Sequence, residues 1–189
     1  MTFNEFLPLL FMGVMGLSLL IYVVLDGYDL GVGLLLPHAT DDEKDTMINS
    51  IVPFWDANET WLVLGVGVLL VAFPKAHGVV LTALYLPVTF MLLGLVLRGV
   101  AFDFRVKVDV AYKPLWNRIF FIGSLVTSVS QGWMLGSYIT GFSNHWSQLV
   151  FNLGVAITLP FAYTLLASGW LIMKTEGGLI EKSRRWGRI

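Results

Sequence analysis

Apolar residues run along this chain in long unbroken stretches, without the alternation that is typical of half-buried strands. The stretch from Phe6 to Leu25 contains no Asp, Glu, Lys or Arg, and it has about the length that a helix needs to cross a hydrocarbon core of about 30 Å. Residues 119–173 are also free of these charges, and they are long enough for two crossings separated by a polar break. Continuous apolar runs favour helices over the strands of a closed barrel.

The pattern therefore predicts an all-α integral membrane protein, a single bundle of about five transmembrane helices over residues 1–189. The expected spans are 6–30, 50–74, 77–100, 118–140 and 149–173. Composition supports this class, because 56% of the residues are hydrophobic, 13% are charged and the mean hydropathy is +0.74. The first Lys or Arg is Lys44, so the opening run lacks the basic region of a signal peptide, and we expect it to be a retained helix.

The distribution of Lys and Arg predicts the orientation. Lys75 is the one basic residue among the N-terminus and the loops on its side, whereas the other 11 of the 12 lie at or beyond the opposite ends of the spans. Short loops rich in Lys and Arg stay in the cytoplasm. We therefore expect the N-terminus on the periplasmic side and the tail after Lys174 in the cytoplasm.

Two acids stand at the front of the second span, in the sequence PFWDANETWLVLGVGVLLVAFP at 53–74. Counted from Pro74 at about 1.5 Å per residue, Glu59 lies about 22 Å and Asp56 about 27 Å into a core of about 30 Å. Their spacing of three puts both on one face of a helix. We expect them near the cytoplasmic edge of the membrane, directed toward protein partners.

The first and third spans bring further charges to the same depth, namely Asp26 and Asp29 in one and Arg98 in the other. Four acids would then meet one base, and both desolvation and repulsion between like charges favour the protonated form for at least one acid. Intramembrane acids commonly mark ion or proton pathways. These five residues are therefore candidates for proton uptake, with Arg98 as the charge partner and Glu59 as the less certain acid.

A second interpretation stays open for some of these acids. Asp26, Asp29 and the acids of residues 41–45 would also suit a solvated collar of charge at the inner membrane boundary. Cofactor chemistry has few donors, since the chain has no Cys and His38, His77 and His145 all fall at loops or span ends. Haem in a helical bundle usually takes ligands from within the spans, so we expect this chain to bind neither haem nor metal.

Four motifs resemble a known family. They are DGYDLGVG at 26–33, MINSIVPFWDANETWL at 47–62, LRGVAFDFR at 97–105 and MKTEGGL at 173–179. In order and spacing they are similar to subunit II of the cytochrome bd quinol oxidases, and the resemblance extends over the whole chain. The ETW at 59–61 resembles the cyanide-insensitive branch.

The resemblance implies an inner-membrane complex of bacteria or archaea that oxidises ubiquinol, reduces oxygen to water and takes its protons from the cytoplasm. It implies a heterodimer in which subunit I carries haem b, haem d and the quinol site, while subunit II supports it and supplies part of a proton path. Asp56 matches the family's candidate proton-uptake acid. A structural quinone or lipid and a small accessory subunit are left open. Family members have about nine spans, so these five are expected to be the first half of such a subunit.

Two other functions compete with this one. A proton-coupled secondary transporter also carries intramembrane acids and proline-broken helices, but it predicts deeper polar side chains and an internal repeat, which the sequence lacks. A purely structural scaffold subunit predicts that neutral replacements in the acidic cluster change stability alone.

Overall fold

The computed structural model describes residues 2–143 and 145–188 of the chain. Helices account for all of the regular structure in these residues: α1 Phe3–Leu35, η1 Leu36–His38, α2 Asp41–Ile51, α3 Trp55–Ala72, α4 Pro74–Ala83, α5 Tyr85–Lys107, η2 Val110–Tyr112, α6 Lys113–Ile139, α7 Trp146–Lys174 and α8 Gly178–Trp186. Five segments, centred on α1, α3, α5, α6 and α7, are long and apolar enough to cross a membrane. The predicted all-α membrane fold with five spans is confirmed.

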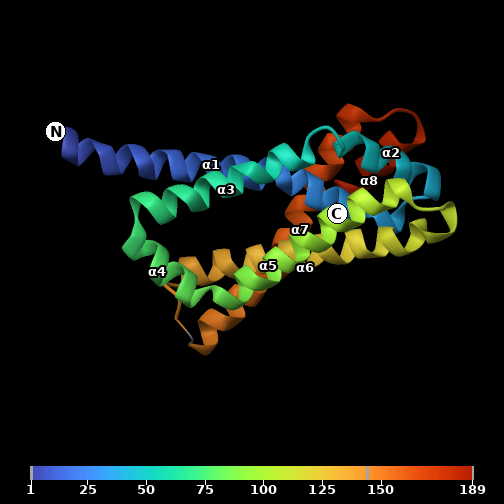
Figure 1. Ribbon diagram of the computed structural model, residues 1–189. Coiled ribbons are helices and arrows are strands. Elements are labelled where there is room, and N and C mark those ends of the chain that lie inside the picture. Colours follow the sequence, from blue (N-terminus) through green and yellow to red (C-terminus); the bar gives the residue numbers. More distant parts are fainter. Residues whose placement is uncertain (1, 144, 189) are drawn as a thin grey trace.

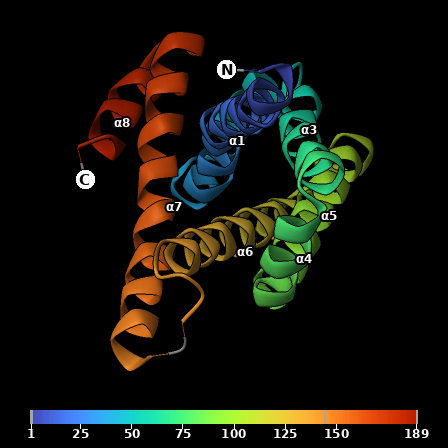
Figure 2. The same cartoon turned by 90° about the vertical axis from the view of Figure 1, so that its left-hand side faces the viewer.

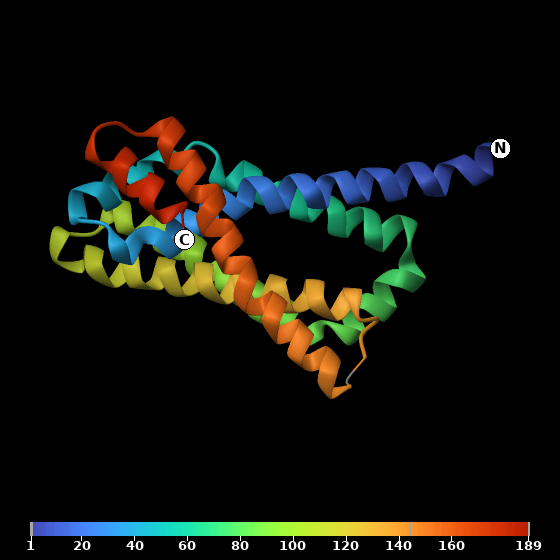
Figure 3. The ribbon, with the colours of Figure 1, turned by 180° about the vertical axis from the view of Figure 1, so that it is seen from behind.

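Helix α6 lies in the middle of the bundle, in contact with α5, α7 and α1 (Figure 2). Helices α1 and α3 lie side by side and diverge from the other three toward the N-terminal end, where α4 crosses back to α5 (Figure 1). The short helices α2 and α8 gather at the opposite end, seen from behind in Figure 3. By the orientation expected from the sequence, that opposite end is the cytoplasmic one.

The segment expected as one span at 77–100 is divided in two at Leu84. Helix α4 ends at Ala83, four residues before Pro87. A proline has no N–H to donate to the carbonyl four residues earlier, and its ring crowds that carbonyl. The break therefore falls beside Ala83, whose carbonyl would accept a hydrogen bond from residue 87 in a continuous helix and cannot do so from a proline.

The main apolar core lies at the end that holds α2 and α8. Met47, Ile48 and Ile51 of α2 are fully buried there, together with Leu171 of α7 and Phe120 of α6. Fully burying side chains of this size stabilises a fold by about 1.5–3 kcal/mol each. In contrast, the N-terminal half of α1 is largely exposed within this chain.

Candidate functional site

Arg98 is the centre of the charged cluster. Its side chain is 1% exposed and receives two carboxylates from different helices: Nη1 lies 2.6 Å from Oδ1 of Asp26 on α1, and Nη2 donates to Oε1 of Glu59 on α3. The position of Arg98 follows from a close contact between α5 and α6, where Gly94 and Gly123 face each other with no room for a Cβ on either.

Asp29 adds a third carboxyl group one turn along α1. Its Oδ2 accepts a hydrogen bond of 2.8 Å from Nδ2 of Asn58, which also donates to the Tyr28 hydroxyl at 2.9 Å. Asp29 Oδ1 and Asp26 Oδ2 are buried and have no hydrogen-bond partner among the described residues. The cluster thus holds three carboxyl groups and one guanidinium, which pairs with Asp26 and Glu59, and both aspartates are fully buried.

The structure brings four of the five candidate residues together and leaves one apart. Asp26, Asp29, Glu59 and Arg98 form a single cluster, whereas Asp56 is exposed and makes no ion pair among the described residues. The inward face of the start of α3 carries Asn58, which is buried, and Trp55, which packs on Phe102. We expected four acids in the cluster, and the structure places three there, without Asp56.

The alternative of a solvated collar does not describe Asp26 and Asp29, because both are fully buried. It does describe part of the α2 segment, where the Asp41 side chain is 86% exposed and pairs with Lys44 at 2.8 Å. The reason for the difference is position, since the two aspartates of α1 face α5 and α3 while Asp41 opens the first turn of a surface helix.

A buried polar chain continues from the cluster into the bundle. Tyr163 of α7 donates to Oε1 of Gln131 on α6 at 2.6 Å, and Nε2 of Gln131 donates to the hydroxyl of Tyr22 on α1 at 2.6 Å. Tyr22 stands one helical turn before Asp26. These three residues were not predicted from the sequence, although the i, i+4 spacing of Tyr22 and Asp26 was a signal. Gln131 and Tyr163 are brought near only by tertiary packing.

A second group of charges, outside the spans, fastens α2 to the bundle. Asp45 Oδ1 accepts from Arg105 at 2.5 Å and Oδ2 from Lys113 at 3.0 Å, while Nε of Arg105 donates to Oδ1 of Asn117 at 2.6 Å. Partial burial opposes ionisation of Asp45, but the hydrogen bonds from Lys113 and Arg105 outweigh it and lower its pKa. The pKa of Glu43 is lowered mainly by the hydrogen bond from Lys182 of α8, 2.7 Å away.

The described residues do not offer a haem or metal site of the usual kind. His38 and His145 are exposed and His77 is half-buried on the short helix α4, so none of them is buried within the bundle, where an axial ligand would usually lie. No group of three or more His, Asp or Glu side chains in the described part of the chain is arranged to hold a metal ion.

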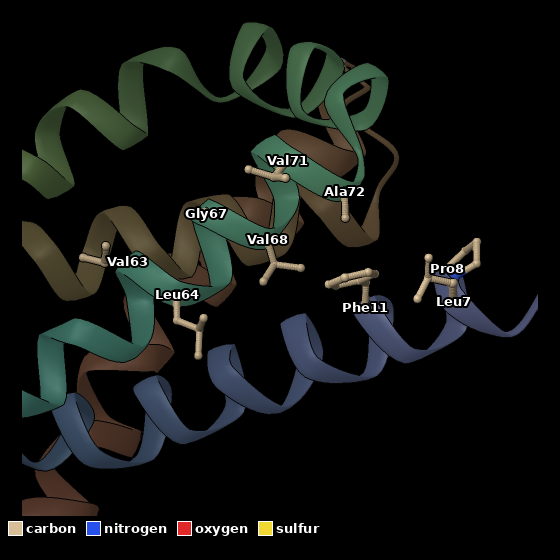
Figure 4. A pocket seen from close by; sticks show the side chains of 9 residues that line it. All are labelled: Leu7, Pro8, Phe11, Val63, Leu64, Gly67, Val68, Val71 and Ala72. Atoms are coloured by element: carbon tan, nitrogen blue, oxygen red, sulfur yellow. The ribbon is translucent and has the colours of Figure 1, made fainter. Parts of the chain in front are cut away.

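A hollow of about 800 Å³ separates the N-terminal half of α1 from α3 (Figure 4). Its lining is entirely apolar and comprises Leu7, Pro8, Phe11, Val63, Leu64, Gly67, Val68, Val71 and Ala72. These side chains offer no hydrogen bond that would orient a polar ligand. The hollow is therefore a poor candidate for the binding site of a polar substrate.

Fold and site together define a multi-pass helical membrane protein that buries several carboxyl groups against one guanidinium. Residues 7–189 match the family described as cytochrome bd terminal oxidase subunit II. The chain belongs to this family, which confirms the resemblance carried by the four motifs.

Curated relatives agree with this assignment. The chain is 40% identical over 184 residues to cytochrome bd ubiquinol oxidase subunit 2 of Bacillus subtilis, covering 87% of this chain and 52% of that protein. It is 29% identical over 191 residues to cytochrome bd-I ubiquinol oxidase subunit 2 of Escherichia coli K12, covering 92% and 50%. The probable cytochrome oxidase subunit 2 of Haemophilus influenzae is also 29% identical, and the match covers 98% of this chain and 53% of that protein. The chain spans about half the length of the curated relatives it matches.

Proposed function

We propose that this chain forms the first half of subunit II in a cytochrome bd-type ubiquinol oxidase of a bacterial inner membrane. The complex would oxidise quinol and reduce oxygen to water, and the N-terminus would face the periplasm. Family membership and the names of the relatives support the class of complex. The distribution of Lys and Arg, 11 to 1 in favour of one side of the bundle, supports the orientation.

The haems belong, on this proposal, to a subunit I partner. The three histidines of this chain are placed at helix ends or on short helices, where they do not suit axial ligation inside a bundle. When bound in the partner, the haems supply the electron transfer and the oxygen chemistry. The residues of this chain would then contribute packing against the partner and the handling of protons.

The proton role rests on one observation: of the three carboxyl groups in the cluster, only two pair with its one guanidinium. Arg98 pairs with Asp26 and with Glu59, so Asp29 is left with a neutral amide, that of Asn58. Keeping a third negative charge there, without a base of its own, would be costly. Asp29 is therefore the group proposed to hold a proton that it can accept and release.

The proposed route into the cluster runs along α3. The Glu59 side chain is 27% exposed, so it is the member of the cluster that reaches the surface of this chain. Asp56 stands three residues earlier on the same helix and is exposed. A proton from the cytoplasm would meet Asp56 first and then pass to Glu59 and Asp29.

The test is oxygen consumption and proton uptake by the purified oxidase complex carrying Asp29→Asn or Asp56→Asn. Asparagine has nearly the shape of the neutral acid but carries no transferable proton, so turnover should fall about tenfold or more in each variant. Asp42→Asn is the matched control, because Asp42 is an exposed acid on α2 without an ion pair among the described residues.

Haem spectra of the same preparations report whether the complex has assembled. Unchanged turnover in both variants, with normal haem content, would leave the cluster as a structural device and refute the proton role. Normal turnover in Asp56→Asn alone would place the uptake point elsewhere while keeping Asp29 in the route.

A further inference from the structure

A groove of about 370 Å³ lies between α7 and α8, away from the charged cluster. One side is apolar and belongs to the spanning helix, with Leu165 and Ile172 exposed to the surroundings. The other side is basic and is formed by the side chains of Arg184 and Arg188. Gly169 also lines the groove, and a Cβ there would meet nothing within 4 Å.

The groove lies at the depth of a lipid headgroup layer. Helix α8 folds back along α7, so that Gly187 stands against Ser168, six residues before the end of α7 at Lys174. At 1.5 Å per residue this is about 9 Å along the helix. Arg184 and Arg188 are thus beside the last two turns of the span, where phosphates of the inner leaflet would lie if the tail is cytoplasmic.

The side chains around the groove carry an excess of positive charge, which favours an anionic ligand. Arg184 pairs with Glu181 of its own helix at 2.7 Å, but both side chains are more than half exposed, at 55% and 63%, and such pairs contribute little. Arg188 makes no ion pair among the described residues, while Lys182 is committed to Glu43. From Lys174 onward the chain carries five basic and two acidic residues.

We propose that this groove binds an anionic phospholipid, with the phosphate held by Arg184 and Arg188 and one acyl chain laid along Leu165 and Ile172. Guanidinium groups hold phosphate oxygens through paired hydrogen bonds, and basic pockets on the cytoplasmic side of helices suit such headgroups. The apolar wall of α7 would gain nothing from a free phosphate or an acidic protein segment. The inference does not depend on oxidase activity, but its assignment to the inner leaflet rests on the proposed orientation of the chain.

Native mass spectrometry of the detergent-purified complex tests the site, with either phosphatidylglycerol or phosphatidylcholine added. The variant is Arg184→Gln/Arg188→Gln. Arg185→Gln is the matched control, because it removes the same kind of charge from the same exposed helix without lining the groove. The wild type and the control should retain phosphatidylglycerol about tenfold more strongly than the double variant. All three proteins should retain phosphatidylcholine equally.

The outcomes separate the possible ligands. An equal loss of phosphatidylglycerol from Arg185→Gln would overturn the proposal in favour of general attraction to charge. Equal retention of both lipids by the wild type would also overturn it, because the groove would then bind lipid without regard to headgroup charge. Displacement of phosphatidylglycerol by inorganic phosphate alone would assign the groove to a free anion, and displacement by an acidic peptide would assign it to a protein. If the double variant does not assemble, Arg188→Gln alone carries the comparison, because its side chain makes no ion pair among the described residues.

Discussion

At the scale of residues, the cluster depends on Arg98 more than on any of its acids. Its guanidinium is buried and holds Asp26 and Glu59 from two different helices. A buried charge whose partner is removed is strongly destabilising, because nothing then compensates its desolvation. The acids can lose a charge by protonation, whereas an arginine keeps its own.

Arg98→Gln should therefore destabilise the protein by about 3–5 kcal/mol. The variant leaves Asp26, Asp29 and Glu59 together without a base. Thermal unfolding of the detergent-solubilised complex measures the loss, and Lys107→Gln at the exposed end of the same helix is the control. A variant with the melting temperature of the wild type would show that Arg98 is dispensable.

The sequence was informative about this site where charges interrupt apolar runs. Asp26, Asp29, Glu59 and Arg98 stood out because each is costly in a membrane, and the depth count placed them at one level. The prediction that Asp56 joins the cluster was wrong. A spacing of three leaves two side chains about 60° apart around the helix, so one of them can face outward. Gln131 and Tyr163 carried no signal, since uncharged polar residues are common in such helices. The expectation that the bundle lacks deeper polar side chains was therefore wrong.

At the scale of elements, close helix contacts determine where the cluster lies. Gly31 of α1 meets the backbone carbonyl of Tyr163 on α7, and Gly33 meets Ser124 of α6. A methyl group at either position would force the helices apart. Since Tyr163 also donates to Gln131, this contact sets the register of the polar chain that leads to Asp26.

Gly31→Ala should destabilise the protein by about 1–3 kcal/mol, the usual cost of overpacking a tight contact. Gly16→Ala on the same helix is the matched control, because a Cβ there meets nothing within 4 Å. Alanine favours a helix over glycine by about 1 kcal/mol, so the control should be neutral or slightly stabilising. Thermal unfolding of both variants makes the comparison, and equal melting temperatures would contradict the close approach.

The ion pair between Glu43 of α2 and Lys182 of α8 should make the docking of α8 depend on pH. The pKa of Glu43 in the folded protein is lowered from its ordinary value of 4.5. A lowered pKa means that the stabilisation is complete above about 4.5 and is lost as pH falls through the folded value. Hydrogen-exchange protection factors of the α8 amides should therefore drop in acid.

Glu43→Gln should show the weaker protection of α8 already at neutral pH. Glutamine keeps the capping box at the start of α2, so the charge pair is the main thing removed. Asp42→Asn, which leaves that pair intact, should behave as the wild type. Protection of α8 that is the same in all three proteins across this pH range would show that apolar packing alone holds the helix.

Element by element, the sequence predicted the long helices better than the short ones. Uninterrupted apolar runs fix α1, α3, α6 and α7 because a membrane leaves the backbone little alternative to a helix. The division at Leu84 depends on Pro87 and on the missing bond to Ala83. The amphipathic helix α8 depends on burying Leu179 and Ser183 against neighbours that the sequence alone does not place.

At the scale of the whole molecule, the chain is a bundle with most of its buried contacts at one end. The end that carries α2 and α8 holds the apolar core, the ion pairs of Asp45 and the cluster at Arg98. At the other end, α1 and α3 lie side by side and diverge from α5, α6 and α7 (Figure 1). Much of the outer surface of the five long helices is apolar and exposed within this chain. That surface is what lipid, a partner subunit and the remaining half of a full-length relative would cover.

The central claim is that one carboxyl group of the cluster, that of Asp29, carries a proton at neutral pH. Infrared spectroscopy of the complex in H₂O and in D₂O tests it most directly, because a protonated carboxylic acid has a carbonyl stretch that a carboxylate lacks and that shifts on deuteration. The account predicts such a band in the wild type and in Asp42→Asn, and its loss in Asp29→Asn. A wild-type spectrum in which the band is absent, or a band that survives in Asp29→Asn, would contradict it.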